Sequence, residues 1–386
     1  MSLRRLKAWE AAGLVDAATA ARIRDWESSH ASPVAMRAVI GIAVLAIGLG
    51  LISVVAANWD AVPGVVRLGV HFALMVGLAF WLWRRTPAES DGSLASEAGL
   101  FVLGVLGLTF FGHIGQVYQT DSPLWQPLTL WLALFAPAML LRGTGRLSAL
   151  LLMAVIIIAA SEFVSWTMGL RPRLGPIDET LRVALALASP LLLAGLAAWA
   201  RARSTRTAFW RHIDGIALTY AAVGASIFAV ASASGPWRTD EDALRLLWSV
   251  VVMAGVTLIT ALLVRMFRRD AEGRVVADLW LGLAAMPLLA YALSGSKVIA
   301  ALLFMALWAG IAFSALRAGW RSVFQTAVGL IALRLVLLSF ELGGDLLRSG
   351  AGLIASGLLI LGVAWLALKI SKRFAPPADP SSEVRS

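Results

Sequence analysis

Polar side chains stand at the ends of two long apolar segments of the chain, where they could form a binding site. Asn58 and Asp60 follow the first of these segments, and His113, Gln116 and Tyr118 close another. Amide, carboxylate, imidazole and phenol groups supply the hydrogen bonds and charges that orient a small ligand. If both segments cross a membrane in the same direction, these side chains emerge on the same face.

Further ionisable side chains lie within the apolar segments themselves. A charge at the centre of a bilayer costs about 2.5–3.5 kcal/mol, so such residues usually face a cavity or a partner. Arg334 and Glu341 are seven residues apart, hence on one helical face and able to join one polar network. The sequence predicts an outward-facing polar pocket lined by Asn58, Asp60, His71, His113, Gln116, Tyr118, Glu162, Arg334 and Glu341.

Several of these residues also have a simpler interpretation. Asn58 and Asp60 can cap the helix that follows, and Trp59 between them fits the aromatic belt of a membrane protein. Glu162 and Glu341 can reach the water of the headgroup layer without lining any pocket. Both interpretations stay open at the level of sequence.

The motifs of common catalytic and metal sites are missing from the sequence. The chain has no cysteine, which excludes disulfides, thiolate nucleophiles and cysteine-ligated metals. His71 and His113 lie on different segments and lack the i, i+3 or i, i+4 spacing of paired ligands, so we expect no metal site and no cofactor. There is no Gly-x-Ser-x-Gly elbow or phosphate-binding loop, and pairs such as Gly104 and Gly107 are typical of close helix contacts.

The elements that must position these residues are membrane-spanning helices. Of 386 residues, 59% are hydrophobic and 15% charged, far from the composition of a soluble protein. Segments of roughly 20 residues that are apolar all round can cross the bilayer core. We expect an all-α polytopic transmembrane helical bundle of about 12 spans, the fourth weakened by Pro127 and Pro137. The spans are 38–57, 65–83, 95–115, 124–141, 147–168, 181–200, 213–233, 244–264, 275–293, 297–316, 320–340 and 349–371.

The net charge of +10 is distributed unevenly between alternate loops. Of the 33 Lys and Arg residues, 24 fall on the side of the N-terminus. Basic residues beside spans are retained in the cytoplasm, so both termini are predicted to be cytoplasmic. The expected partners of this charge are anionic headgroups on the cytoplasmic side of the bilayer, and nucleic acid is not expected.

Two short terminal regions flank the predicted bundle of residues 37–372. Residues 1–36 are predicted to form a cytoplasmic amphipathic helical hairpin, in which Gly13 ends the first helix and Asp16 caps the second. Residues 373–386 have the Pro/Ser composition of a disordered tail. The hairpin could clasp the bundle, recruit a protein partner or sense a ligand.

The order of motifs in residues 1–145 resembles a family of bacterial membrane proteins of unknown function, domain-of-unknown-function family 2157. The resemblance implies a polytopic protein of a bacterial plasma membrane, and it brings no reaction, substrate or catalytic residues. The residues that carry it are Leu6, Trp9 and Gly13-Leu14-Val15-Asp16, then Arg22-Ile23 and Trp26-Glu27, then Ala56-Ala57-Asn58-Trp59-Asp60 and Gly115-Gln116-Val117-Tyr118.

Three classes of function are compatible with this sequence. The first is a transport or small-ligand/lipid-binding protein that uses the outward-facing pocket. The second is a structural or assembly protein that recruits a partner through the N-terminal hairpin. The third is an envelope enzyme, which is disfavoured because no catalytic constellation is visible.

Overall fold

The fold was analysed in a computed structural model, which describes residues 12–30, 62–84, 94–169, 176–237 and 243–342. Single residues between 6 and 10, at 46 and between 354 and 374 are also described. Within these ranges the chain is helical and contains no strand, as the composition predicts. Its contacts divide the chain into two compact units, residues 1–70 and 71–386.

In the first unit, described helical residues precede a turn at Gly13. Leu6, Trp9 and Glu10 are helical, and Gly13 follows with φ of 70°. The Gly13 N–H donates to the carbonyl of Glu10, and the Leu14 N–H donates to that of Trp9. This pair of bonds is the Schellman motif, which requires a left-handed residue and so favours glycine. The predicted role of Gly13 is therefore confirmed.

The second N-terminal helix, α2, spans Ala17–His30. Asp16 caps it by accepting a hydrogen bond from the Thr19 N–H at 3.2 Å. Hydrogen bonding from the Thr19 side chain and backbone lowers the pKa of the Asp16 carboxyl. The cap is as predicted, while much of the rest of segment 1–36 lies outside the described residues, so the complete hairpin remains a prediction.

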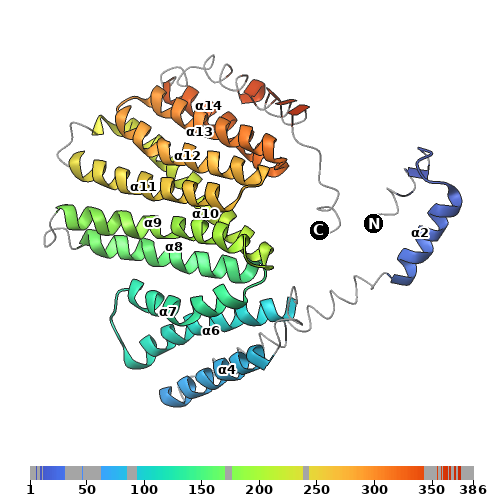
Figure 1. The fold of residues 1–386 in the computed structure, drawn as a ribbon, viewed down its shortest axis with the longest axis vertical. Coiled ribbons are helices and arrows are strands. Elements are labelled where there is room, and N and C mark those ends of the chain that lie inside the picture. The colour runs from blue at the N-terminus through green and yellow to red at the C-terminus, as the bar shows by residue number, and fades with distance from the viewer. Residues whose placement is uncertain are drawn as a thin grey trace. The chain divides into compact units, whose positions relative to one another are not determined.

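The second unit is a row of long helices, to which α4 contributes its residues from His71 onward (Figure 1). Helices α8, α9, α11, α12, α13 and α14 each pack against the next, and α10 contacts α8, α9, α12 and α13. Helices α6 and α7 pack on each other and on α8. The elements are α4 (Gly64–Arg84), α6 (Leu94–Tyr118), α7 (Trp125–Arg142), α8 (Arg146–Gly169), α9 (Pro176–Arg201), α10 (Thr207–Ala231), η3 (Ser232–Ser234), α11 (Ala243–Phe267), α12 (Ala271–Ala292), α13 (Lys297–Ala318) and α14 (Arg321–Leu342).

Among the described residues, nine helices are long and apolar enough to cross a membrane. They correspond to nine of the predicted spans. Helix α7, the predicted fourth span, forms but falls outside these nine, because its 18 residues include Gln126, two prolines and Arg142. The predicted spans 38–57 and 349–371 lie almost entirely outside the described residues, so the total of about 12 is not confirmed.

Glycines of α6 allow its close approach to α7, as their spacing predicts. A Cβ on Gly104 would lie 2.4 Å from Cε of Met139, and one on Gly107 would lie 2.5 Å from Cζ of Phe135. The indole Nε1–H of Trp131, which is fully buried, donates to the carbonyl of Gly104 at 2.8 Å. Small residues thus bring the two helices within hydrogen-bonding distance, the usual basis of helix association in lipid.

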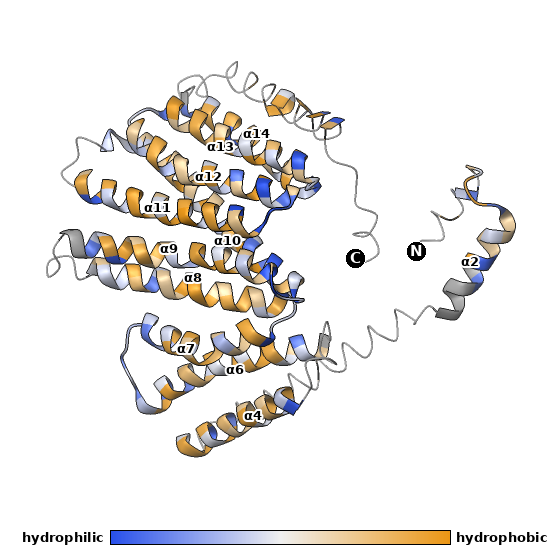
Figure 2. Ribbon diagram, in the orientation of Figure 1, coloured by the Kyte–Doolittle hydropathy of each residue, from blue (hydrophilic) through white to orange (hydrophobic). Residues whose placement is uncertain are grey.

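Basic side chains gather at one end of the row, which we call the basic end and define by Arg142, Arg201, Arg206, Arg268 and Arg317. Figure 2 shows hydrophilic residues at this end of α9 to α14 and apolar residues along the middle of the helices. The loop before α10 contacts the end of α7 here: Arg206 donates to the carbonyls of Gly143 and Leu140 at 3.0 and 2.9 Å. The alternation of basic loops in the sequence therefore reflects one physical end of the bundle.

The opposite end is held by bonds between its loops. The Gly295 N–H donates to the carbonyl of Ser232 at 2.8 Å, and the Trp237 N–H donates to Oγ of Ser294 at 3.0 Å. The Tyr291 hydroxyl donates to the carbonyl of Ala243 at 3.2 Å. These contacts join the ends of α10, α11, α12 and η3 at the end of the bundle opposite the basic end. Helices α10, α11 and α12 therefore run in alternating directions between the two ends.

Candidate functional site

Two of the predicted pocket residues, His71 of α4 and His113 of α6, lie side by side. Their Nδ1 atoms are 3.5 Å apart, and their ring centroids are 5.8 Å apart. His113 is buried and His71 is half-buried. The two helices run antiparallel here, since Phe72 packs against Phe110 while Trp81 and Leu82 lie beside Gly99 at the other end.

The hydrogen bonds of His71 determine which of its nitrogens carries the proton. Its Nε2 lies 3.0 Å from the carbonyl oxygen of Leu106, an atom that can only accept a hydrogen bond. Nε2 therefore carries the hydrogen and donates it to Leu106. In the neutral ring, Nδ1 then has a free lone pair, and it is this atom that faces Nδ1 of His113.

An aromatic ring and a hydroxyl are among the described neighbours of His71. Phe110 meets the His71 ring edge-on at 5.2 Å between centroids. The hydroxyl oxygen of Thr109 lies 3.5 Å from Nε2 of His71, and its one hydrogen can be donated to the carbonyl of Val105 or of Leu106, each 3.1 Å away. A pair of imidazoles in such surroundings can share a proton, accept a hydrogen bond from a ligand or bind a cation.

A second pair of predicted pocket residues meets on α14. Arg334 is 3% exposed and donates to both carboxylate oxygens of Glu341, at 2.6 and 3.2 Å. The spacing of seven residues predicts one helical face for both, and on that face they form an ion pair. Figure 1 places α14 and α6 at opposite ends of the row, so this ion pair and the histidine pair are two separate polar sites.

The other predicted pocket residues are dispersed or lie outside the described ranges. Gln116 and Tyr118 are exposed near the end of α6, and Glu162 is half-buried in α8. Asn58 and Asp60 lie outside the described residues. Ligand binding by the full set of nine residues therefore stays a prediction.

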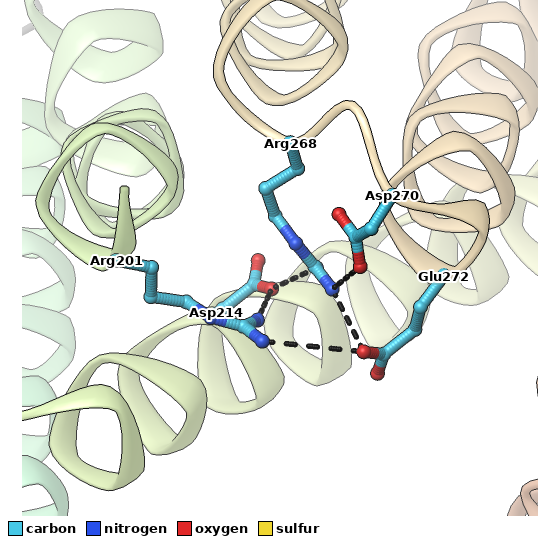
Figure 3. Close-up of polar contacts among 5 residues, drawn as sticks. All are labelled: Arg201, Asp214, Arg268, Asp270 and Glu272. Carbon is cyan, nitrogen blue, oxygen red and sulfur yellow. Dashed lines mark hydrogen bonds and ion pairs between the residues drawn. The ribbon is translucent and has the colours of Figure 1, made fainter. Parts of the chain in front are cut away.

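Sequence reasoning missed a cluster of five charged residues at the basic end, which we call the charged cluster. Its centre is Arg268, just after α11, whose guanidinium lies 3.2 Å from Asp214 of α10 and 3.0 Å from Glu272 of α12. Asp270 approaches it to 3.6 Å, and Arg201 at the end of α9 lies 3.6 Å from Asp214. Figure 3 shows the three carboxylates turned toward the two guanidinium groups.

Burial distinguishes the charged cluster from the ion pairs around it. The side chains of Arg268 and Asp214 are 4% and 8% exposed, whereas those of Arg265 and Asp278, which pair at 3.5 Å, are 58% and 44% exposed. A buried charge is costly unless it is paired, so the cluster ties together the helix ends that supply it. In the sequence, an aspartate inside an apolar segment beside an arginine-rich loop would have indicated it.

Glu97 of α6 makes another buried polar contact at the basic end. It accepts hydrogen bonds from the backbone N–H groups of Thr144 and Ser148, at 3.1 and 2.9 Å. Both hydroxyls add bonds, at 3.3 and 2.8 Å. Glu97 of α6 therefore caps the N-terminus of α8. It accepts from N–H groups that have no partner within α8, and its negative charge lies at the positive end of the helix dipole.

No group of three or more histidine or acidic side chains suited to a metal ion occurs within the part of the chain that the structure describes. No curated protein and no solved structure matches the chain. Over its N-terminal part the chain does match a family model: residues 7–147 match DUF2157, described as predicted membrane protein, which confirms the resemblance predicted from the motifs of residues 1–145.

Proposed function

We propose that this multi-pass membrane protein binds or transports a small ligand or lipid through an outward-facing polar site centred on His71 and His113. In this proposal about 12 helices span the plasma membrane of a bacterium, and both termini are cytoplasmic. The basic end then faces the cytoplasm, where anionic headgroups neutralise its exposed arginines.

The single observation that carries the proposal is the meeting of two imidazoles from separate helices, with their Nδ1 atoms 3.5 Å apart. A contact that serves only helix packing would be more stable with apolar or small side chains, because polar groups are costly in a bilayer. By helix rise, His71 lies about 10 Å from the start of α4, and His113 lies five residues before the end of α6. Both therefore belong to the half of the helices away from the basic end.

The charged cluster supports the same proposal from the other side of the bundle. Its ion pairs draw the ends of α9, α10, α11 and α12 together at the basic end. A bundle that is tied at its cytoplasmic end and carries a polar site in its outer half is suited to receive a ligand from outside.

Identification of the molecules that co-purify with the protein tests the proposal. We expect native mass spectrometry of the full chain, released from detergent micelles, to show a bound small molecule or lipid that His113→Ala loses. The matched control is His212→Ala, a half-buried histidine of α10 near the basic end, which should retain it. Equal occupancy in both variants, or no bound molecule in the wild type, would contradict the proposal.

A second candidate function, recruitment of a protein partner, is favoured by exposed apolar residues beside Gly13. Leu14 is 73% exposed and Trp9 is 39% exposed, next to a turn that the Schellman bonds hold in place. Two large apolar side chains that a turn holds next to each other offer a small surface that a partner could cover. Cross-linking through a photoreactive residue at position 14 should give a defined protein adduct that is absent when the residue is placed at exposed position 208.

A further inference from the structure

The arginines at the ends of α9 and α11 divide into an inward pair and an outward pair. Arg201 and Arg268 turn inward to Asp214, at 3.6 and 3.2 Å. Arg203 and Arg269, one or two positions further along the chain, are exposed. Neither of these two forms an ion pair with a carboxylate of the residues that the structure describes. The outward pair therefore carries positive charge that the described part of the protein does not neutralise.

Arg203 is held by aromatic rings from both helices. Its Cζ lies 4.8 Å from the ring centroid of Trp199 on α9 and 5.7 Å from that of Phe267 on α11. One turn earlier the helices are in close contact, since a Cβ on Gly195 would lie 2.6 Å from Cδ1 of Leu263. A guanidinium that stacks on rings keeps N–H donors free at its edge, in a fork that matches the oxygens of a phosphate.

The same pairing of ring and cation recurs around the basic end. On each of three helices an exposed aromatic residue stands four positions before an exposed arginine, on the same helical face. The distances from Cζ to the ring centroid are 4.8, 4.8 and 5.8 Å for Phe80 and Arg84, Trp199 and Arg203, and Phe313 and Arg317. Exposed aromatic residues followed by cations are typical of the boundary between the hydrocarbon and the headgroups of a bilayer.

Arg203 differs from the other two arginines of this pattern. Arg317 also lies 3.6 Å from Asp278, which partly neutralises it, and Arg84 stacks on a ring of its own helix. Only Arg203 among the three joins rings from two helices. The seam between α9 and α11, which pack side by side (Figure 1), thus ends in a fixed cation at the level of the headgroups.

We infer that Arg203, Trp199 and Phe267 form a binding site for the headgroup phosphate of an anionic phospholipid, with Arg269 as a second positive charge. Exposed apolar side chains nearer the middle of the same two helices then contact the acyl chains; they include Leu196, Leu262 and Met266. This apolar continuation favours a lipid over free phosphate. The site lies on other helices than His71 and His113, so it goes beyond the proposed function and does not depend on it.

Lipid binding to the full chain tests the inference. The protein is stripped of co-purified lipid in detergent, and native mass spectrometry counts the bound phosphatidylglycerol and phosphatidylcholine. We expect the wild type to prefer phosphatidylglycerol, and Arg203→Gln to weaken its binding about fivefold, as the loss of one basic residue at a membrane surface does. The control Arg321→Gln removes an equal charge from an exposed position at the start of α14. Equal weakening in both variants would show attraction by charge alone and would overturn the site.

Two further comparisons separate this site from other sources of binding. Inorganic phosphate should not displace phosphatidylglycerol, and displacement would show a site for free phosphate instead of a lipid. His113→Ala should bind phosphatidylglycerol like the wild type. Loss in His113→Ala but not in Arg203→Gln would place the lipid at the histidine pair, overturning this site and supporting the proposed function.

A measurement on the wild-type chain covers the case in which the variant does not fold. Phosphatidylglycerol with a photoreactive group near the start of its acyl chain is added to the protein and activated, and peptide mapping locates the adducts. We expect adducts within residues 192–203 and 259–269. Adducts confined to other segments, or spread evenly over all the exposed helices, would overturn the site.

Discussion

Asp214 and Arg268 are 54 residues apart in the sequence, yet their side chains meet at 3.2 Å where α10 passes the end of α11. Both residues are nearly inaccessible, at 6% and 5% exposure. Arg201 and Glu272 approach the same two side chains from α9 and α12. One ion pair thus lies where four helices converge.

Removal of the Arg268 guanidinium should strongly destabilise the protein. Breaking a buried ion pair by losing one partner leaves an uncompensated charge, at a cost of about 3–5 kcal/mol. The matched control is Arg265→Gln, whose exposed pair with Asp278 should contribute about 0–1 kcal/mol. Thermal unfolding in detergent, followed by tryptophan fluorescence, measures both variants. Similar losses for Arg268→Gln and Arg265→Gln would show that the charged cluster does not hold the helices together.

Gly273 of α12 should tolerate no side chain. A Cβ there would lie 2.4 Å from Cβ of Arg268 and 2.5 Å from its carbonyl oxygen. Overpacking of this kind costs about 1–3 kcal/mol. Gly282, on the same helix, has nothing within 4 Å of an added Cβ, and Gly282→Ala should be neutral or slightly stabilising because alanine favours helix. The melting temperatures of the two alanine variants give the comparison. A melting temperature for Gly282→Ala below that of Gly273→Ala would refute the expectation.

The contact between α6 and α7 should depend on Gly104 in the same way. Gly104→Ala would drive a methyl group against Met139 and Leu151, at 2.4 and 2.7 Å, and disturb the bond from Trp131 to the Gly104 carbonyl. Gly112→Ala, on the same helix with nothing within 4 Å, is the control. We expect Gly104→Ala to increase protease cleavage in the loop between α6 and α7 relative to Gly112→Ala. Indistinguishable digestion patterns would argue against tight packing at this point.

The orientation in the membrane can be measured directly because the chain has no cysteine. Thr120 follows α6 at the end away from the basic end, and Thr205 lies between α9 and α10 at the basic end; both are exposed. We expect a membrane-impermeant maleimide to label Thr120→Cys in intact cells and to label Thr205→Cys after permeabilisation. The reverse pattern would invert the proposed topology.

The elements could be predicted from the sequence because hydropathy is a local property. Segments that are apolar all round became helices at nearly the expected positions, and the Arg334–Glu341 pair followed from helical periodicity alone. Gly13 and Asp16 were predictable for the same reason, since a helix end depends on the residues beside it. The span count exceeded the nine candidate helices partly because α7 carries more polar groups than its neighbours.

The sites could not be predicted to the same degree, because they depend on which helices meet and in what register. His71 and His113 are 42 residues apart, and nothing in either segment specifies the offset that brings their rings together. The sequence interpretation treated the arginines of the charged cluster only as determinants of membrane orientation. That rule counts exposed and buried arginines alike, so it could not single out the buried ones. The contact of Arg268 with Asp214 shows that this arginine also joins helix ends through a buried ion pair.

The bonds made by α7 bear on the order in which the chain is assembled during synthesis. The carbonyls of Leu140 and Gly143 at its end are satisfied by Arg206, which the ribosome adds after α8 and α9 are complete. These carbonyls lie at the basic end, where water can bind them until Arg206 is made, so the end of α7 reaches its final contacts only when the start of α10 is in place. The end of α7 should therefore settle after the start of α10, and a chain truncated before Arg206 should keep this end accessible.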